Sequence, residues 1–411
     1  WHYPFEHQDD FDQLFPADFI CEGIDQTRGW FYSLLSISTF LFDQPPYKSV
    51  LVNDLVLDKK GQKMSKSKGN TVNPWKLIEK YGADATRWYL LAVSPPWTPT
   101  RFDEDGLKEV FSKFFGTILN VYSFFTLYAN IDGAEPQLYN IPVQEREEID
   151  RWIISRLNSV TKQIREDMAA YELTKVVRAI QNFMIDDVSN WYVRRTRERF
   201  WAPKMDQNKQ AVYRTLWEVL ITVAKLMAPF APFLAEEIYQ NIVRSVDSSA
   251  PESIHLCRYP VADESLIDKD LEKNMEEVLK IVVLGRACRN VSNIKTRQPI
   301  AGMYVKAPFA LEDFYKEIIE DELNVKAVTF TDDVRSYTTY TFKPQLKTVG
   351  PKYGKHLRAI KHYLSSLDAN AAMDELNNNG MLKFEDGGTG IELTKDDLLI
   401  DMTQQEGYVT Q

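Results

Sequence analysis

Closely spaced lysines and hydroxyl groups between two glycines form the stretch of this chain whose chemistry is easiest to interpret. Residues 61–70 read Gly-Gln-Lys-Met-Ser-Lys-Ser-Lys-Gly-Asn. Glycine lets the backbone approach a ligand closely, and lysine neutralises charge that builds up on phosphate oxygens. A solvated basic loop is the simpler interpretation of a lysine run. We expect Lys66 first, and Lys63 second, to bind the phosphates of a nucleotide. Ser65 and Ser67 bond phosphate or shape the loop.

A second group of polar residues follows a strand-like segment near the start of the chain. The apolar residues 19–21 predict a strand that ends at Glu22, and Gly23 gives a turn. Open α/β sheets bind ligands at the carboxyl ends of their strands. Asp25 could simply cap the helix that follows. Because Glu22, Asp25 and Gln26 together exceed what a cap needs, we expect a ligand site here.

These two stretches resemble one enzyme family. Residues 63–67, Lys-Met-Ser-Lys-Ser, stand between an apolar strand-like run at 50–57 and a helix start at Asn73. In that context they resemble the signature loop of class I aminoacyl-tRNA synthetases. Residues 22–32 resemble the isoleucyl version of that family's adenylate-binding segment. The resemblance implies activation of isoleucine with ATP and Mg²⁺, followed by transfer to tRNA(Ile).

The resemblance also assigns roles to single residues. Glu22 is expected near the amino group of isoleucine, because a carboxylate suits an ammonium. Gly23, Asp25 and Gln26 complete the expected adenylate-binding segment. The expected contacts to adenine come from residues just before the loop: Asn53, Leu55 and Val56.

Further segments resemble the tRNA-binding part of the same family. Residues 188–195 and 228–237 are similar to its helical anticodon-binding region, and residues 294–300 to a third shared segment. Splayed RNA bases stack on aromatic rings and guanidinium planes, and arginine also binds phosphate. Ion pairs on the helix surface explain the same arginines equally well. The expected tRNA-binding residues are Arg194, Arg195, Arg197, Arg199, Lys295 and Arg297.

One expected signature is not found in the sequence. The family's other motif is a His-x-Gly-His type turn that holds ATP. None of the histidines stands in such a turn: His2, His7, His255, His356 and His362. The chain also opens on residues 1–4, Trp-His-Tyr-Pro, which read like the middle of a longer protein. We therefore expect a carboxyl-terminal fragment that lacks the first half of the catalytic domain and is inactive alone.

Composition limits the classes of protein that the chain can belong to. Its length predicts about two to three domains. The net charge of −10 argues against a general nucleic-acid-binding protein and predicts a patchy surface. No run of about 20 apolar residues predicts a membrane span. Three scattered cysteines suggest neither a zinc site nor disulfides, so no metal site is expected. We expect a cytoplasmic protein, and a monomer.

Patterns along the chain predict three parts. Residues 1–104 are expected to form the C-terminal part of a Rossmann-like α/β catalytic domain, with a buried helix at 30–42. Residues 105–260 carry apolar stripes at steps of three and four, which predict an all-α helical bundle. Residues 261–411 mix helix and strand patterns, which predict a small α+β module.

Two alternatives remain open beside this assignment. The first is a fragment of a valyl or leucyl synthetase, both of which belong to the same class. The sequence at residues 22–31 argues against it, because it resembles the isoleucyl version of that segment. The chain could also serve only as a tRNA-binding module. An unrelated nucleotide-binding protein would need a Gly-x-x-x-x-Gly-Lys-Ser/Thr phosphate loop, and none occurs.

Overall fold

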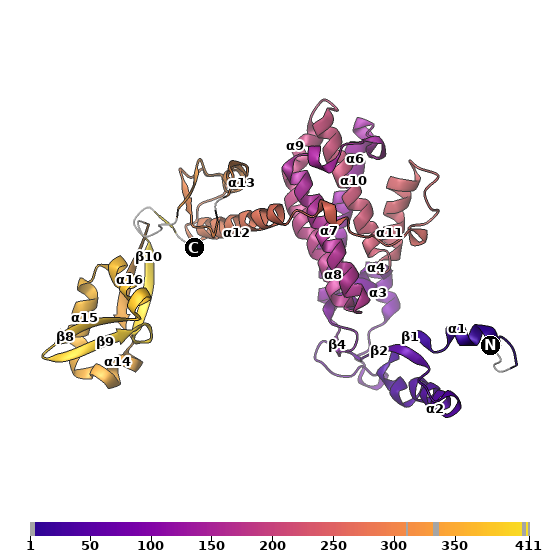
Figure 1. Cartoon of the computed structure of the whole chain (residues 1–411), viewed down its shortest axis with the longest axis horizontal. Coiled ribbons are helices and arrows are strands. Elements are labelled where there is room, and N and C mark those ends of the chain that lie inside the picture. The colour runs from indigo at the N-terminus through magenta and orange to yellow at the C-terminus, as the bar shows by residue number, and fades with distance from the viewer. Residues whose placement is uncertain (1–4, 310, 332–336, 405–407, 410–411) are drawn as a thin grey trace. The chain divides into compact units, whose positions relative to one another are not determined.

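The computed structural model describes residues 5–309, 311–331, 337–404 and 408–409. Residues 1–4, which contributed to the fragment hypothesis, lie outside that range. Contacts divide the chain into two compact units, Trp1–Lys269 and Asp270–Gln411, and each is described by itself (Figure 1).

The first unit begins with a short parallel α/β segment. After helix α1 (Gln8–Leu14), strand β1 (Ala17–Gly23) pairs in parallel with β2 (Tyr47–Asn53), so that Gly23 lies opposite Asn53. The crossover contains the 3₁₀ turn η1 (Ile24–Arg28) and helix α2 (Trp30–Phe42). A strand–helix–strand crossover between parallel strands is the unit of doubly wound folds. The prediction of a strand ending at Glu22 and a helix at 30–42 is confirmed within one residue.

Two details of this segment were predicted wrongly. The single strand expected at 50–57 is two strands, because the chain leaves β2 after Asn53 and the Asp54 amide donates to the Pro96 carbonyl at 2.8 Å. Strand β3 (Val56–Leu57) then pairs with β4 (Thr100–Arg101). Helix α2 was expected to be buried, yet only two of its side chains, Phe31 and Ser38, are.

The lysine loop leads into two helices. Helix α3 (Pro74–Tyr81) starts as predicted, with the Asn73 side chain accepting a hydrogen bond from the Trp75 amide at 3.0 Å and proline at its first position. Helix α4 (Ala83–Val93) follows after Gly82, whose φ of 85° suits glycine. Trp88 and Tyr89 of α4 are buried, so this helix belongs to the core.

The rest of the first unit is the expected helical bundle, shown in magenta and rose in Figure 1. Several of its helices contain π-helical turns. Its elements are α5 (Glu104–Glu109), η3 (Val110–Phe115), α6 (Gly116–Asp132), α7 (Glu148–Ala169), α8 (Leu173–Asn182), η6 (Phe183–Val193), α9 (Arg194–Trp201), α10 (Gln207–Met227), α11 (Pro232–Tyr239) and η7 (Gln240–Arg244). The long connection around residues 132–142 holds only the 3₁₀ turn η4 (Pro136–Leu138).

One continuous helical run in the bundle, residues 104–132, is long and apolar enough to cross a membrane by length and composition alone. The sequence had suggested that no run reaches this length. Phe114, Ile118, Val121 and Phe125 are buried, and α6 packs on α10 and η6. Core helices of soluble proteins pass the same test, so this run is weak evidence for a membrane span.

The second unit contains one long helix, α12 (Lys269–Val291), and two small α/β parts. The part next to α12 comprises β5 (Met303–Val305), β6 (Val328–Phe330) and α13 (Asp313–Leu323). The last part, which we call the C-terminal module, comprises β7 (Thr338–Pro344), α14 (Leu346–Tyr353), α15 (Leu357–Ser366), α16 (Ala369–Asn379), β8 (Met381–Asp386), β9 (Thr389–Thr394) and β10 (Leu398–Gln404). Its core includes Val349, Ile360, Leu382 and Leu393. The sequence had not predicted α14, α16 or the three last strands.

Candidate functional site

The lysine loop is held closed at its base by one aspartate. The two carboxylate oxygens of Asp58 accept hydrogen bonds from the backbone amides of Lys60 and Gln62, at 3.0 and 2.8 Å, and from the Asn70 side chain at 2.8 Å. The Asn70 side chain also accepts from the Ser65 amide at 2.9 Å. Asp58 and Asn70 therefore join the two ends of the loop. Sequence analysis missed both, although an aspartate three residues before a glycine is a turn signal.

The lysines in the loop differ in their partners. Lys59 forms ion pairs with Asp103 and Asp105, at 3.0 and 2.9 Å, and the hydrogen bonds that its ammonium donates to those carboxylates raise its pKa. Lys63 and Lys66 are exposed, and in the described part of the chain no carboxylate lies within ion-pair distance of either. Both ammonium groups are thus available to a polyanionic ligand, as expected for residues that bind phosphate.

The loop's hydroxyls bond within the loop. Ser65 Oγ lies 3.1 Å from Ser67 Oγ and accepts from the Lys68 amide at 3.3 Å, which caps the short turn η2 (Lys66–Lys68). Gly69 ends that turn with a φ of 66°. Loop shaping is therefore the role that these serines already have without a ligand.

Hydrogen bonds at the loop's base make its closure sensitive to acid. The bond from the Asn70 side chain, helped by the Gln62 amide, lowers the pKa of the Asp58 carboxyl. A carboxyl whose pKa is lowered by folding stabilises the closed loop above its unfolded pKa of about 3.9, and that contribution is lost as pH falls through the lower folded value.

We expect Asn70→Ala to open the loop at neutral pH, as we expect acid to open it in the native chain. The variant removes the bond to Asp58 and the acceptor for the Ser65 amide. Limited trypsin digestion should cleave after residues 63–68 several-fold faster than in the native chain. The control is Asn73→Ala, which alters only the cap of α3. Equal cleavage rates in Asn70→Ala and the native chain would contradict this role.

The predicted adenylate-binding segment lies at the carboxyl ends of β1 and β2. Glu22 is exposed beside Gly23, and Gly23 lies opposite Asn53 in the parallel register. A Cβ atom at Gly23 would come within 2.7 Å of the Asp25 carboxylate, so the side chain of Asp25 occupies that space. The strand ends thus bring Glu22, Asp25 and Asn53 to one edge of the sheet.

Gln26 has a structural partner that the sequence did not reveal. Its side-chain oxygen accepts a hydrogen bond from the Trp30 amide at 2.8 Å, in the first turn of α2, and its amide donates to Asp25 at 3.1 Å. Gln26 therefore caps α2, the role that we had weighed for Asp25. Asn53 donates to Cys21 Sγ at 3.2 Å, and Leu55 and Val56 are exposed.

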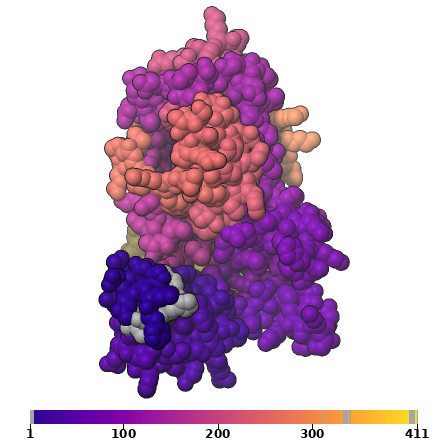
Figure 2. Space-filling model, turned by 90° about the vertical axis from the view of Figure 1, so that its right-hand side faces the viewer, coloured from indigo at the N-terminus to yellow at the C-terminus, as the bar shows by residue number. Residues whose placement is uncertain are grey.

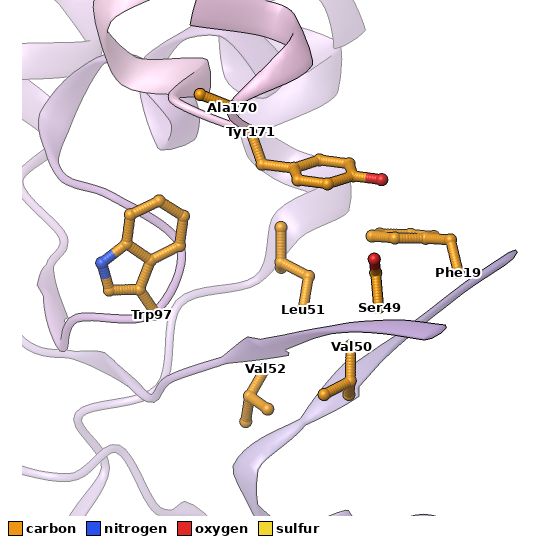
Figure 3. Close-up of a pocket in the computed structure, with 8 residues that line it drawn as sticks. All are labelled: Phe19, Ser49, Val50, Leu51, Val52, Trp97, Ala170 and Tyr171. Atoms are coloured by element: carbon orange, nitrogen blue, oxygen red, sulfur yellow. The ribbon is translucent and has the colours of Figure 1, made fainter. Parts of the chain in front are cut away.

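An apolar crevice lies beside the same strands (Figure 3). Phe19 stacks on Tyr171, from the turn between α7 and α8, with ring centroids 5.2 Å apart. The other lining residues are Ser49, Val50, Leu51, Val52, Trp97 and Ala170. Because the lining carries no charged side chain, this crevice does not match the chemistry expected of a nucleotide site.

Helix α4 joins the α/β segment to the bundle through bonds at both of its ends. At its start, the buried Asp84 carboxylate accepts from the amides of Phe233 and Leu234, at 3.4 and 2.7 Å, and burial raises the pKa of this carboxyl. At its end, Arg178 of α8 donates to the carbonyls of Ala92 and Val93, at 2.8 and 2.9 Å. Figure 2 shows the α/β segment, in indigo, directly below the bundle.

Further hydrogen bonds show that the segment at 228–237 makes this junction. Arg87 donates to the carbonyls of Phe230 and Pro229, at 3.1 and 3.2 Å. The resemblance had placed these residues in the anticodon-binding region. In the structure they also attach the bundle to α4.

The predicted tRNA-binding arginines lie in different environments. Arg197 is exposed, whereas Arg194 and Arg195 both lie over the Trp191 ring, 5.6 and 5.7 Å from its centre. Arg199 points into the bundle, where its guanidinium donates to the fully buried Asp150 at 2.9 and 2.7 Å. Burial lowers the pKa of Arg199, but the bonds and charge of Asp150 outweigh it and the pKa is raised. The geometry gives Arg199 a structural role.

The second basic pair lies on a loop that one buried arginine supports. Arg289 of α12 donates to the carbonyls of Lys295 and Gln298, at 3.0 and 2.9 Å, and to those of Leu323 and Asn324. Lys295 and Arg297 are exposed on this loop. The arrangement fixes the loop's backbone and leaves both cations facing solvent.

The described residues contain no group of three or more His, Cys, Asp or Glu side chains that could hold a metal ion. The residues with phosphate-binding chemistry are the loop lysines.

Known families match two parts of this chain, and known proteins match nearly its whole length. The family described as "tRNA synthetases class I (I, L, M and V)" matches residues 1–103, and the "Anticodon-binding domain of tRNA ligase" matches residues 150–305. An isoleucine–tRNA ligase of Clostridium novyi is 46% identical over 99% of this chain and 39% of its own length. One of Clostridium kluyveri is 47% identical over the same shares. The chain thus spans about two fifths of the length of these relatives.

A solved structure shares part of the arrangement. It is a LeuRS of Agrobacterium radiobacter K84 in a ternary complex with tRNA and LeuAMS, with a TM-score of 0.48 and 20% identity over 62% of this chain and 30% of that one. At this level the likeness adds nothing to the assignment.

Proposed function

Because the chain belongs to the class I tRNA synthetases, with isoleucine–tRNA ligases as relatives over almost its whole length, we propose that it carries two parts of such an enzyme. One is the half of the adenylate site that holds the lysine loop. The other is the module that binds tRNA(Ile). The observation that carries the proposal is the match to both domains in one chain, in that order.

In the proposed reaction, the carboxylate of isoleucine attacks the α-phosphate of ATP, which gives isoleucyl-adenylate and releases pyrophosphate. The terminal ribose hydroxyl of tRNA(Ile) then takes the aminoacyl group. Such chemistry needs positioned charges more than a strong base. Lys66 and Lys63, which have no carboxylate partner among the described residues, are the proposed ligands of the ATP phosphates.

The half-site is proposed to bind the adenylate through the strand ends. In this proposal, Glu22 binds the ammonium of isoleucine, and Asp25 and Gln26 bind polar groups of the adenylate. Asn53, Leu55 and Val56 are the proposed neighbours of adenine. The cap that Gln26 provides to α2 fixes the start of this segment, so its role also includes positioning.

We propose that this chain does not activate isoleucine on its own. Among the described residues, strand β1 pairs only with β2, and many apolar side chains of α2 and the strands are exposed, including Tyr32, Ile37 and Phe40. Parallel sheets are normally covered on both faces, so this segment needs further protein to complete it. A monomeric state and a cytoplasmic location belong to the same proposal.

The test is pyrophosphate exchange with isoleucine, valine and leucine as separate substrates. The chain alone should show no exchange. Supplying the preceding part of the Clostridium novyi enzyme as a second polypeptide should restore exchange with isoleucine. Exchange by the chain alone would refute the half-site, and a preference for valine or leucine would refute the isoleucyl assignment. If the mixture shows no exchange, the chain alone is treated with a lysine-acylating reagent in the presence and absence of ATP. Failure of ATP to protect Lys66 from acylation would then refute the half-site.

A module that only binds tRNA remains the second candidate, favoured by the match at residues 150–305. This second candidate predicts that the chain binds tRNA and that ATP does not protect the lysines of the loop from acylation. The same acylation experiment separates it from the first proposal.

A further inference from the structure

Charge is strongly segregated along the C-terminal module. Between residues 343 and 367 the sequence has six lysines or arginines and no carboxylate, whereas between 368 and 406 it has ten carboxylates and two lysines. The whole chain is acidic, with a net charge of −10. A solvated surface normally mixes both signs. This segment lies beyond both matched domains, which end at residues 103 and 305.

Helix α15 turns these cations outward on one face. Ile360 and Leu364 are buried in the core of the module, with exposed fractions of 0% and 4%. Arg358, Lys361 and His362 lie three and four residues apart and are exposed. Such spacing places side chains on the same side of a helix. Together with the exposed Lys355, one turn earlier, they form what we call the α15 basic face.

Carboxylates of the module pair with the cations around this face rather than with the face itself. Lys343 pairs with Asp401 at 3.3 Å, Lys352 with Asp397 at 2.9 Å, and His356 with Asp386 at 2.8 Å. For Lys355, Arg358 and Lys361, no carboxylate of the described residues lies within ion-pair distance.

The position of these cations also works against the stability of the helix. Arg358 lies in the first turn of α15, and Lys355 lies just before it, where the helix dipole disfavours positive charge. Helices usually carry Asp or Glu there. A local charge rule that is broken without a compensating partner is typical of a functional surface.

We propose that the α15 basic face binds the phosphate backbone of RNA, and that in this chain the RNA is tRNA. The identity of the RNA rests on the function proposed above. The outward face of α15 bears Arg358, Lys361, His362 and Ser365 and no apolar side chain. Protein interfaces have an apolar core, and interfacial helices insert apolar side chains into lipid. A polyanion can bind to such a face without any apolar side chain on it.

The test compares two double variants of the full chain with equal loss of charge. Arg358→Ala/Lys361→Ala removes the centre of the face. Lys273→Ala/Lys306→Ala removes two exposed lysines of the same unit, one on α12 and one directly after β5. Binding to an isoleucine tRNA transcript is measured between 50 and 200 mM salt, with unrelated tRNA and phosphatidylserine vesicles as further probes.

Each lost phosphate contact should lower the salt slope of the binding constant by about 0.7 to 0.9. The face variant should therefore bind tRNA about tenfold more weakly at low salt, with a slope smaller by about 1.5. The control should bind like the native chain. Because all four side chains are exposed, the melting temperature should not fall in either variant.

Three outcomes would overturn the proposal: no tRNA binding by the native chain, equal losses in the two variants, or binding of vesicles in preference to tRNA. Loss of binding in the face variant together with no discrimination among tRNAs would support the face and count against the proposed tRNA(Ile) specificity. The test therefore distinguishes refutation of RNA binding by the α15 basic face from refutation of the proposed tRNA(Ile) specificity.

Discussion

Replacing Asp150 by alanine is expected to lower the free energy of unfolding of the first unit by about 3–5 kcal/mol, because removing one partner leaves a buried charge without compensation. Asp150 of α7 is fully buried. It accepts hydrogen bonds from Tyr192 at 2.5 Å and from the Arg199 guanidinium at 2.9 and 2.7 Å. Arg199 also donates to the Asn208 carbonyl at 3.0 Å, so the carboxylate links four helical elements of the bundle.

The measurement is urea unfolding followed by circular dichroism, with fits that allow the two units to unfold separately. The matched control is Glu147→Ala. Glu147 is about half exposed and lies 3.3 Å from the same guanidinium. Surface pairs contribute about 0–1 kcal/mol, so the control should change little. A loss below about 1 kcal/mol in Asp150→Ala would show that the network is not essential to the bundle.

Replacing Lys66 by alanine is expected to lower isoleucine-dependent pyrophosphate exchange by about 10²–10³-fold in the reconstituted enzyme, the loss typical when one positioned group that stabilises developing charge is removed. Lys66 is exposed, no carboxylate of the described chain pairs with it, and Asp58 and Asn70 hold the base of its loop. The effect should fall mainly on kcat if the contact forms in the transition state.

The control for Lys66 is Lys68→Ala, in the same exposed turn. It should retain exchange within a few-fold, because Lys66 and Lys63 are the proposed ligands of the phosphates and Lys68 is expected to face solvent or tRNA. The loss of exchange in Lys63→Ala should be intermediate between the losses in Lys66→Ala and Lys68→Ala. If Lys66→Ala kept more than a tenth of native exchange, or if Lys68→Ala lost as much, the assignment of Lys66 to the phosphates would be wrong.

Local sequence signals predicted those elements whose ends are set by local chemistry. The Asn73–Pro74 pair placed the start of α3, and the glycine turn after Glu22 placed the end of β1. Hydrophobic periodicity identified the bundle, because its helices bury one stripe each. The resemblance to class I synthetases is confirmed by the two matched domains.

Features that depend on contacts distant in sequence were not predictable. The break between β2 and β3 follows from the Asp54 bond to Pro96, and the burial of Arg199 from a carboxylate 49 residues away. The exposure of α2 reflects a sheet with few neighbours, which periodicity alone does not show. Helix α16 has a polar sequence in which only Ala372 and Leu376 are buried, with Ala369 and Met373 partly buried against the same core.

Binding of tRNA(Ile) transcripts to this chain, at near-physiological salt and with anticodon-changed and unrelated tRNAs as controls, tests the central claim most directly. The account predicts tighter binding of the native anticodon, since the chain carries the anticodon-binding domain match at residues 150–305. Weak binding that is equal for all tRNAs, and lost with modest salt, would contradict it and leave the chain as a structural part of a longer enzyme.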